Sequence, residues 1–166
     1  MGQSEQEAEV YEVLKKLDIS FTRHEHPAVY TVEEAEKHWT SIAGAHCKNL
    51  FLRNKKGNRH YLVILEASKI ADLKSLTKRL GEDRLSFASE ERLMRYLGLG
   101  TGAVSAFGLI NDRENHAQVI IDEDLKEAEA VNFHPNVNTA TVGISFADFE
   151  KYLAWCGNSI RYLPFK

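Results

Sequence analysis

Two apolar runs separated by a short polar turn constrain the fold of this chain of 166 residues more than any other feature. The first run covers residues 47–53, the turn covers 54–58 and the second run covers 59–65. Apolar, β-branched and aromatic residues on both sides of a Gly/Asn turn predict a β-hairpin. The second run is apolar almost throughout, which is typical of a central strand covered on both faces. Lys48 adds a cation at the mouth of this hairpin, as either a snorkelling surface group or a site group.

The remainder of the chain mixes helical and strand patterns. Helical spacing and N-capping residues predict helices at residues 4–17, from Thr31 to about Trp39, and after Asp72, Ser89 and Ser145. Short strands are predicted near residues 19–22, 84–87, 116–122, 131–133, 139–144 and 160–163. These elements alternate without a strict βαβ rhythm, and hairpin-length turns join several strands. The pattern predicts an α+β fold, a mixed β-sheet or small irregular barrel with flanking helices, in one domain over residues 1–166.

Charge and cysteine content limit the classes of protein to which this chain can belong. The formal net charge of -3 argues against a broad basic field and therefore against non-specific RNA binding, but not against a domain that grips only an RNA end. Cys47 and Cys156 are far apart and form no CxxC pair, which favours a reduced, intracellular protein. No apolar run approaches the length of a membrane span, and the N-terminus is acidic rather than signal-like. We therefore expect a cytoplasmic protein with no membrane contact.

Metal and thiol chemistry are weakly signalled. His24 and His26 point to the same side of an extended segment, and His46 and Cys47 are further candidate ligands. There is no HExxH motif and no zinc-type spacing, so we interpret these as surface and loop histidines and expect no metal or other cofactor. His46 and Cys47 are neighbours on a predicted strand and point to opposite faces. Cys47 is thus better interpreted as a small buried hydrophobe than as a nucleophile.

A glycine-rich passage, with Gly98, Gly100 and Gly102, follows the helix that Ser89 begins. A dinucleotide fingerprint must instead follow a strand and open a helix, and the passage lacks Gly-Lys-Ser/Thr, so the pattern argues against a nucleotide cradle. Two interpretations remain open. The glycines form a helix C-cap followed by a tight turn, or they bring bare backbone N–H groups close to an oxyanion or phosphate.

Basic residues gather in one local strip, although the net charge of the chain is negative. Arg53, Lys55, Lys56 and Arg59 crowd the predicted hairpin turn, and further cations follow at Lys69, Lys74, Lys78 and Arg79. Such a strip is able to contact phosphates. A charge run on a turn and an amphipathic helix is more often a solvated face, and that interpretation is favoured for each residue.

Four stretches, taken together and in this order, resemble the YbaK-like aminoacyl-tRNA deacylases, the free-standing relatives of the editing domain inserted in bacterial prolyl-tRNA synthetases. They are the His-Glu-His-Pro segment at 24–27 with residues 31–35, residues 47–53 with their Lys-Lys-Gly turn, residues 102–112, and residues 133–136 with 138–141. Any one stretch is a weak signal, whereas the ordered set is specific and spans nearly the whole chain. The branch that it resembles most is the one that clears alanine from proline tRNA, not the one that clears cysteine.

The resemblance implies a mixed, barrel-like sheet with flanking helices, and hydrolysis of the ester that joins a wrong amino acid to the tRNA 3′ adenosine. Lys48 matches the functionally important lysine of the family, and residues 102–106 match the loop whose backbone lines the amino-acid pocket. His134 matches a pocket residue for small amino acids, and His26 belongs to a matching stretch and is counted with the substrate-binding residues. The family loop usually ends in proline, whereas Ala106 stands at that place and predicts a softer turn.

An aminoacyl ester is already activated, so a positioned water, a donor for the developing oxyanion and a fixed substrate suffice for hydrolysis. We expect Lys48 to act as a charge and the backbone near Gly102 to donate. Asn49, Ser105 and Ala106 are candidate substrate contacts, although Asn49 and Ser105 are equally interpretable as ordinary strand or turn residues. Expected partners are the 3′ CCA end of aminoacylated tRNA and prolyl-tRNA synthetase. Cysteine or serine specificity, a non-catalytic tRNA- or amino-acid-binding module and, more weakly, a metal hydrolase using His24, His26 and His46 are the alternatives.

Overall fold

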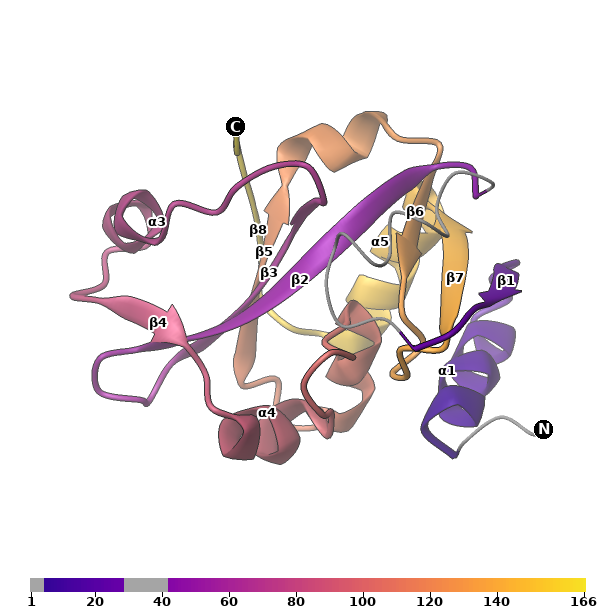
Figure 1. Cartoon of the computed structure of the whole chain (residues 1–166), viewed down its shortest axis with the longest axis horizontal. Helices are drawn as coiled ribbons and strands as arrows, with labels where there is room; N and C mark the ends of the chain where they lie inside the picture. The colour runs from indigo at the N-terminus through magenta and orange to yellow at the C-terminus, as the bar shows by residue number, and fades with distance from the viewer. Residues whose placement is uncertain (1–4, 29–41) are drawn as a thin grey trace.

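A mixed sheet organises the computed structural model, which describes residues 5–28 and 42–166. The described residues form an eight-stranded sheet in the order β1-β7-β6-β2-β3-β5-β8, with β4 paired to β2 beside this path (Figure 1). The strands are β1 (Thr22–Glu25), β2 (Ala45–Asn54), β3 (His60–Glu66), β4 (Leu85–Phe87), β5 (Ala117–Asp122), β6 (Ala130–Phe133), β7 (Ala140–Ser145) and β8 (Ile160–Leu163). Pairing is antiparallel for β1–β7, β2–β3, β2–β4 and β6–β7 and parallel for β2–β6, β3–β5 and β5–β8. The α+β prediction with a mixed sheet is confirmed.

The helices flank this sheet and begin where the capping residues predict. They are α1 (Glu5–Lys16), α3 (Leu73–Arg79), α4 (Glu90–Leu97) and α5 (Phe146–Cys156), with 3-10 helices η1 (Ala106–Asn111) and η2 (Glu123–Glu127). The side chains of Asp72, Ser89 and Ser145 accept hydrogen bonds from the first turns of α3, α4 and α5. None of the described helices is long and apolar enough to cross a membrane. The helix predicted from Thr31 to about Trp39 lies outside the described residues.

The predicted hairpin is formed by β2 and β3. Their register runs from Cys47 opposite Glu66 to Arg53 opposite His60. β3 lies between β2 and β5, and its residues 60–65 are all buried, which confirms the prediction of a central strand. In the turn, Gly57 adopts a φ of +73°, a conformation that favours glycine.

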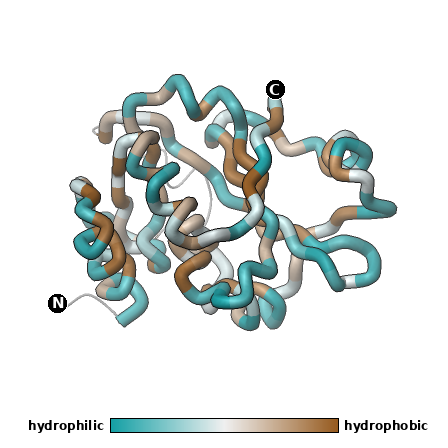
Figure 2. The backbone as a smooth tube through the Cα atoms, turned by 180° about the vertical axis from the view of Figure 1, so that it is seen from behind, coloured by the Kyte–Doolittle hydropathy of each residue, from teal (hydrophilic) through white to brown (hydrophobic). Residues whose placement is uncertain are grey.

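The two faces of the hairpin bury two separate apolar clusters. Phe51 of β2 belongs to the larger cluster, which includes residues of α1, α4 and α5, whereas Leu52 belongs to a smaller cluster with Leu76 of α3. This is the division that strand alternation predicts. Each such side chain contributes about 1.5–3 kcal/mol when fully buried, so both faces of the hairpin are fixed by packing. Seen from behind, the hydrophobic residues follow the inner strands and helices, and the turns are hydrophilic (Figure 2).

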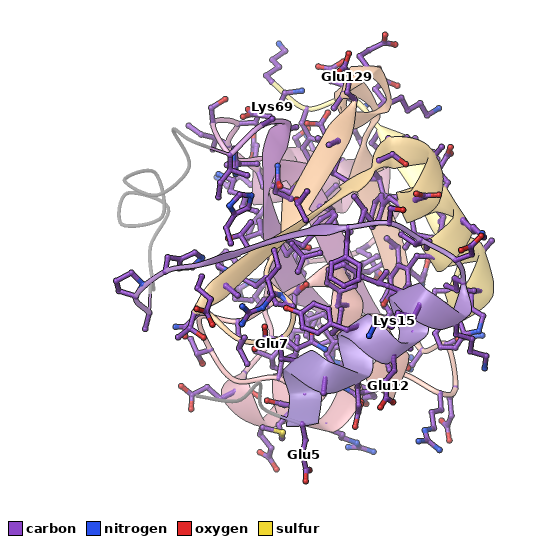
Figure 3. The ribbon with its side chains drawn as sticks, turned by 90° about the vertical axis from the view of Figure 1, so that its right-hand side faces the viewer. Glu5, Glu7, Glu12, Lys15, Lys69 and Glu129 are labelled. Atoms are coloured by element: carbon purple, nitrogen blue, oxygen red, sulfur yellow. The ribbon has the colours of Figure 1, made fainter. Side chains whose placement is uncertain are left out.

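β1 is anchored to α1 by a buried polar cluster. Glu7 of α1 is only 3% exposed and points toward the strands (Figure 3). Arg23 Nε of β1 lies 2.7 Å from Glu7 Oε2 and 2.8 Å from the Tyr11 hydroxyl, which itself donates to Glu7. The strand begins at Thr22 rather than at residue 19 as predicted. Ile19 instead closes α1, because its N–H donates to Leu14 O at 2.9 Å.

Candidate active site

The sheet opens along one edge of β2, next to Lys48. β3 pairs with one edge of β2, and β6 and β4 share the other. On that second edge β6 pairs only at residues 45–46 and β4 only at residues 52–54. No strand among the described residues pairs with the backbone between these two segments. Lys48 and Asn49 therefore lie on a rigid strand beside a break in the sheet.

One face of the β1-β7-β6-β2 half of the sheet is polar. Thr22, Gly143, Asn132 and His46 are register partners across the four strands, and Val131, Phe133, Val142 and Ile144 occupy the opposite face, in the larger core. Lys48 follows His46 by two residues, so its side chain lies on the polar face. If the parallel register of β2 and β6 is extended by two residues, Lys48 comes opposite His134, which follows the end of β6.

His26 and His134 lie together at the end of this polar face. Their ring centroids are 6.1 Å apart. His26 Nε2 lies 2.9 Å from Thr141 Oγ1 of β7, and its Nδ1 lies 2.9 Å from Pro27 O. Thr141 is buried, with 3% exposure, so its hydroxyl fixes the orientation of the His26 ring. The structure thus brings together two of the histidines that the sequence selected.

His134 is held as a neutral imidazole. Its Nδ1 lies 3.0 Å from Ala140 O, and a carbonyl accepts only, so Nδ1 carries the proton and donates. Burial lowers the pKa of His134, and the nearby His26 lowers it further, against the effect of the Ala140 carbonyl. With the proton on Nδ1, Nε2 is a hydrogen-bond acceptor. A substrate ammonium or hydroxyl group is a suitable donor to it.

The loop at residues 102–106 is fixed by hydrogen bonds at its end. Ser105 and Ala106 are fully buried. Ser105 Oγ accepts from Phe107 N at 3.1 Å, and the Tyr152 hydroxyl of α5 donates to Ala106 O at 2.9 Å. These bonds hold the turn that the missing proline was expected to leave softer. Gly102 has a φ of +88°, and its N–H has no hydrogen-bond partner within the described residues.

A side chain that the sequence did not select joins this loop to the histidine pair. Asn136, two residues after His134, donates from Nδ2 to Phe107 O at 3.2 Å and has a φ of 63°. The Phe107 and Phe133 rings also meet edge-on, with centroids 5.8 Å apart. His134 and residues 105–107 are therefore tied together by one amide and one aromatic contact. Asn136 and Thr141 both lie in stretches that carried the family resemblance, which was the available signal for them.

The remaining candidates lie on opposite faces of β2. The Asn49 side chain shares the face of Phe51, and its Oδ1 is buried without a hydrogen-bond partner in the described part of the chain. The Lys48 ammonium, half-buried on the polar face, forms no ion pair there. An unpaired acceptor and an unpaired cation thus flank the break in the sheet. The half-buried Lys48 ammonium is available to a ligand, whereas the buried Asn49 Oδ1 lies on the core side of β2.

Cys47 and His46 do not form a catalytic pair. Cys47 packs against the larger core, whereas His46 shares the polar face with Lys48, as strand alternation predicted. Burial raises the pKa of the Cys47 thiol, so it stays protonated. Residues 5–28 and 42–166 contain no group of three or more His, Cys, Asp or Glu side chains that could hold a metal ion.

Comparison with known proteins identifies the family. The model of the aminoacyl-tRNA editing domain matches residues 26–152. The chain belongs to the aminoacyl-tRNA editing domain family. This editing domain is 45% identical over 148 residues to the prolyl-tRNA editing protein ProX of Acetoanaerobium sticklandii, covering 89% of this chain and 90% of that protein. It is 35% identical over 169 residues to prolyl-tRNA synthetase associated domain-containing protein 1 of Mus musculus, covering 99% of each.

Solved structures agree on the fold of this editing domain. A candidate trans-editing enzyme for prolyl tRNA synthetase superposes with a TM-score of 0.74 at 21% identity, and the match covers 99% of each chain. The resemblance to the YbaK-like deacylases is therefore confirmed, both in family and in fold. The protein is an aminoacyl-tRNA deacylase, and its substrate is an aminoacylated tRNA.

Proposed function

We propose that this editing domain acts in trans on mischarged tRNA(Pro) and that its main substrate is Ala-tRNA(Pro). The observation that carries the proposal is the cluster of His26, His134 and the buried Ser105–Ala106 turn, at the end of the polar face on which the unpaired Lys48 lies. The 45% identity to a prolyl-tRNA editing protein supports the choice of tRNA. Serine and cysteine are the alternative amino acids.

Selection of alanine requires a pocket that excludes proline. Alanine is smaller than proline and fits wherever proline fits, and a missing methylene costs only about 1–3 kcal/mol in an apolar site. A second, smaller pocket must therefore remove the errors. We assign its wall to residues 102–106 and to His134, and Asn136 links the segment after His134 to Phe107, which directly follows that loop. A wall held by buried hydrogen bonds is suited to this role because it does not yield to a larger ring.

We assign hydrolysis to the positioning of the substrate and to electrostatic stabilisation of the negative charge that develops at the ester. Lys48 supplies a positive charge that orients the terminal phosphate or stabilises negative charge near the ester, and the N–H of Gly102 donates to the developing oxyanion. His134 Nε2 is an acceptor suited to the α-ammonium or a hydroxyl group of the substrate. Water is the nucleophile, and the ribose 2′-OH assists in activating it.

A panel of charged tRNAs tests the proposal. The purified protein is incubated with alanyl-, cysteinyl-, seryl- and prolyl-tRNA(Pro), and release of each amino acid is followed. We expect fast release of alanine and no acceleration of proline release. Faster release of cysteine or serine would assign one of those specificities instead. Binding of a non-hydrolysable alanyl-tRNA analogue without turnover of any ester would show a non-catalytic binding module.

Ala106→Pro is expected to leave the fold and the deacylation rate within about twofold of the wild type. Residue 106 is the first residue of η1, a position that accepts proline because its N–H needs no intrahelical partner. Ser105 before it is extended, with φ of -156° and ψ of 151°, as a residue before proline must be. Thermal unfolding measures the effect on the fold, and alanyl-tRNA hydrolysis measures the effect on the deacylation rate. A large loss of activity with an unchanged melting temperature would show that the pocket depends on alanine itself.

The compartment and the partner of this activity are inferred from its substrate. We assign residues 1–166 to one editing domain that acts on the 3′ CCA end in the cytoplasm, where tRNA is charged. Prolyl-tRNA synthetase is the partner that would supply the mischarged tRNA. Co-purification of the two proteins with and without tRNA tests whether they associate.

A further inference from the structure

Two guanidinium groups converge at the tip of the β2–β3 hairpin. A Cβ atom built on Gly57 would lie 2.8 Å from the Nη2 atoms of both Arg53 and Arg92. Arg53 comes from the end of β2, and Arg92 comes from α4, which lies next to the hairpin tip (Figure 1). Cations from two separate elements therefore face one small space, beside a residue that has no side chain.

Backbone carbonyls, rather than carboxylates, hold these two side chains. Arg53 donates from Nε to Asn54 O and from Nη2 to Lys55 O, each at 3.1 Å. Arg92 donates from Nη1 to Gly57 O at 3.0 Å. Neither guanidinium has a carboxylate partner within residues 5–28 and 42–166. Each guanidinium carries several N–H donors in a fixed plane, so both retain donors for an anion.

The surroundings reinforce the positive charge. Lys55 and Lys56 are exposed in the same turn, which is hydrophilic when viewed from behind (Figure 2). Glu82 is already ion-paired with Arg59 at 2.7 Å, so its carboxylate neutralises that arginine rather than the converging pair. Glu90, in the first turn of α4, accepts a hydrogen bond from Thr101.

We infer that Arg53, Arg92 and the Gly57 turn bind a backbone phosphate of the tRNA, outside the pocket that holds the amino acid. The inference takes its partner from the proposed function. Paired guanidiniums recognise phosphate oxygens through several N–H donors at once, and they contact the backbone rather than the bases. The sequence alone favoured a solvated basic face. The convergence of a turn and a helix on one point distinguishes a built anion site from such a face.

The position of this phosphate site suits a nucleic acid held at Lys48. Arg53 follows Lys48 by five residues on the same strand, so the two lie about 17 Å apart along β2. Arg53 folds back onto its own turn, which places its guanidinium at the hairpin tip rather than under either face of the sheet. An RNA whose 3′ end reaches the break in the sheet therefore has phosphates at the distance of this site.

The salt dependence of tRNA binding tests the inference. Affinity for uncharged tRNA(Pro) is measured between 50 and 300 mM KCl, roughly the range in which phosphate contacts dominate, for the wild type and for Arg53→Gln/Arg92→Gln. We expect the double variant to bind about tenfold more weakly at low salt and to lose about one unit of salt slope for each phosphate contact removed. Its kcat at saturating Ala-tRNA(Pro) and its hydrolysis of a short aminoacylated CCA fragment should stay unchanged.

Two further variants make the result decisive. Arg161→Gln removes an exposed arginine from β8 and should keep the wild-type affinity and slope. Arg53→Gln alone keeps the Arg92 contact with His60 and should show an intermediate effect, even if the double variant is unstable. A wild-type slope in Arg53→Gln and in the folded double variant would overturn the inference. Wild-type tRNA binding without any ester hydrolysis would instead contradict the proposed function and leave the phosphate site standing.

Discussion

Lys48→Ala is expected to lower kcat/KM for Ala-tRNA(Pro) hydrolysis by at least about 100-fold, the size of effect seen when one preorganised group that stabilises transition-state charge is removed. Lys48 is half-buried on β2, within the part of the strand, residues 47–53, that pairs with β3. No carboxylate in the described part of the chain neutralises its ammonium. Its charge is therefore available to the substrate, and its loss should not cost a structural ion pair. Single-turnover hydrolysis of labelled alanyl-tRNA measures the effect.

Companion variants separate charge from shape at this position. Lys48→Met keeps most of the aliphatic stem and should be as inactive as Lys48→Ala, whereas Lys48→Arg keeps the charge and should retain part of the activity. Lys15→Ala removes an exposed lysine from α1 and serves as the matched control, with wild-type rates expected. Unfolding curves should be nearly unchanged in all of them. Near-wild-type hydrolysis by a folded Lys48→Ala protein would reject the assigned role.

Local sequence signals predicted the elements of this fold but not how they meet. The hairpin and the starts of α3, α4 and α5 follow from short-range chemistry: apolar alternation, a Gly turn and the side chains of Asp72, Ser89 and Ser145. The parallel contact of β2 with β6 joins residues 45–46 to 131–132, and no local pattern encodes such a distant pairing. That contact, together with β4, creates the break in the sheet beside Lys48.

In the candidate site, too, the sequence predicted the residues but not the contacts that bring them together. His26, His134 and residues 102–106 were selected from the resemblance, and the structure joins them through Thr141, Asn136 and Phe107. These connecting residues act through buried hydrogen bonds, which have no sequence signature of their own. The convergence of Arg53 and Arg92 on Gly57 likewise links a turn to a helix distant in the chain. In the sequence Arg53 is only part of a basic strip, and Arg92 lies outside that strip, in the helix that follows Ser89.

We expect a buried histidine next to that turn to make the stability of the protein fall in mild acid. Arg92 donates toward His60 Nε2 at 3.2 Å, so the neutral His60 ring carries its proton on Nδ1 and donates to His116 Nε2 at 2.8 Å. His60 is fully buried. Burial, as the largest cause, together with the neighbouring His116 ring and the guanidinium groups of Arg92, Arg53 and Arg95, lowers the pKa of His60 from 6.5 to about 4.

The sign of the pH dependence follows from this lowered pKa. Between pH 6.5 and about 4 the unfolded chain binds a proton at residue 60 that the folded protein does not bind. The free energy of unfolding is therefore at its full value above pH 6.5 and decreases as the pH falls to about 4, by up to about 3 kcal/mol at roughly 1.4 kcal/mol per pKa unit. Burial also lowers the pKa of His134 and His46, which adds a loss of the same sign. Glu82, whose pKa Arg59 lowers from 4.5 to about 2, acts only in more acidic solution.

Urea unfolding at several pH values between about 4.5 and 7.5 measures this loss, across the window in which a histidine titrates. His60→Phe should be less stable than the wild type at pH 7.5, because it removes the bonds to Arg92 and His116, but its stability should fall less steeply with acid. Val63→Ala, at a buried position on the same strand, should lower stability at every pH and keep the wild-type slope. If His60→Phe kept the wild-type slope, the loss of stability in acid would have to come from groups other than the Arg92–His60–His116 chain.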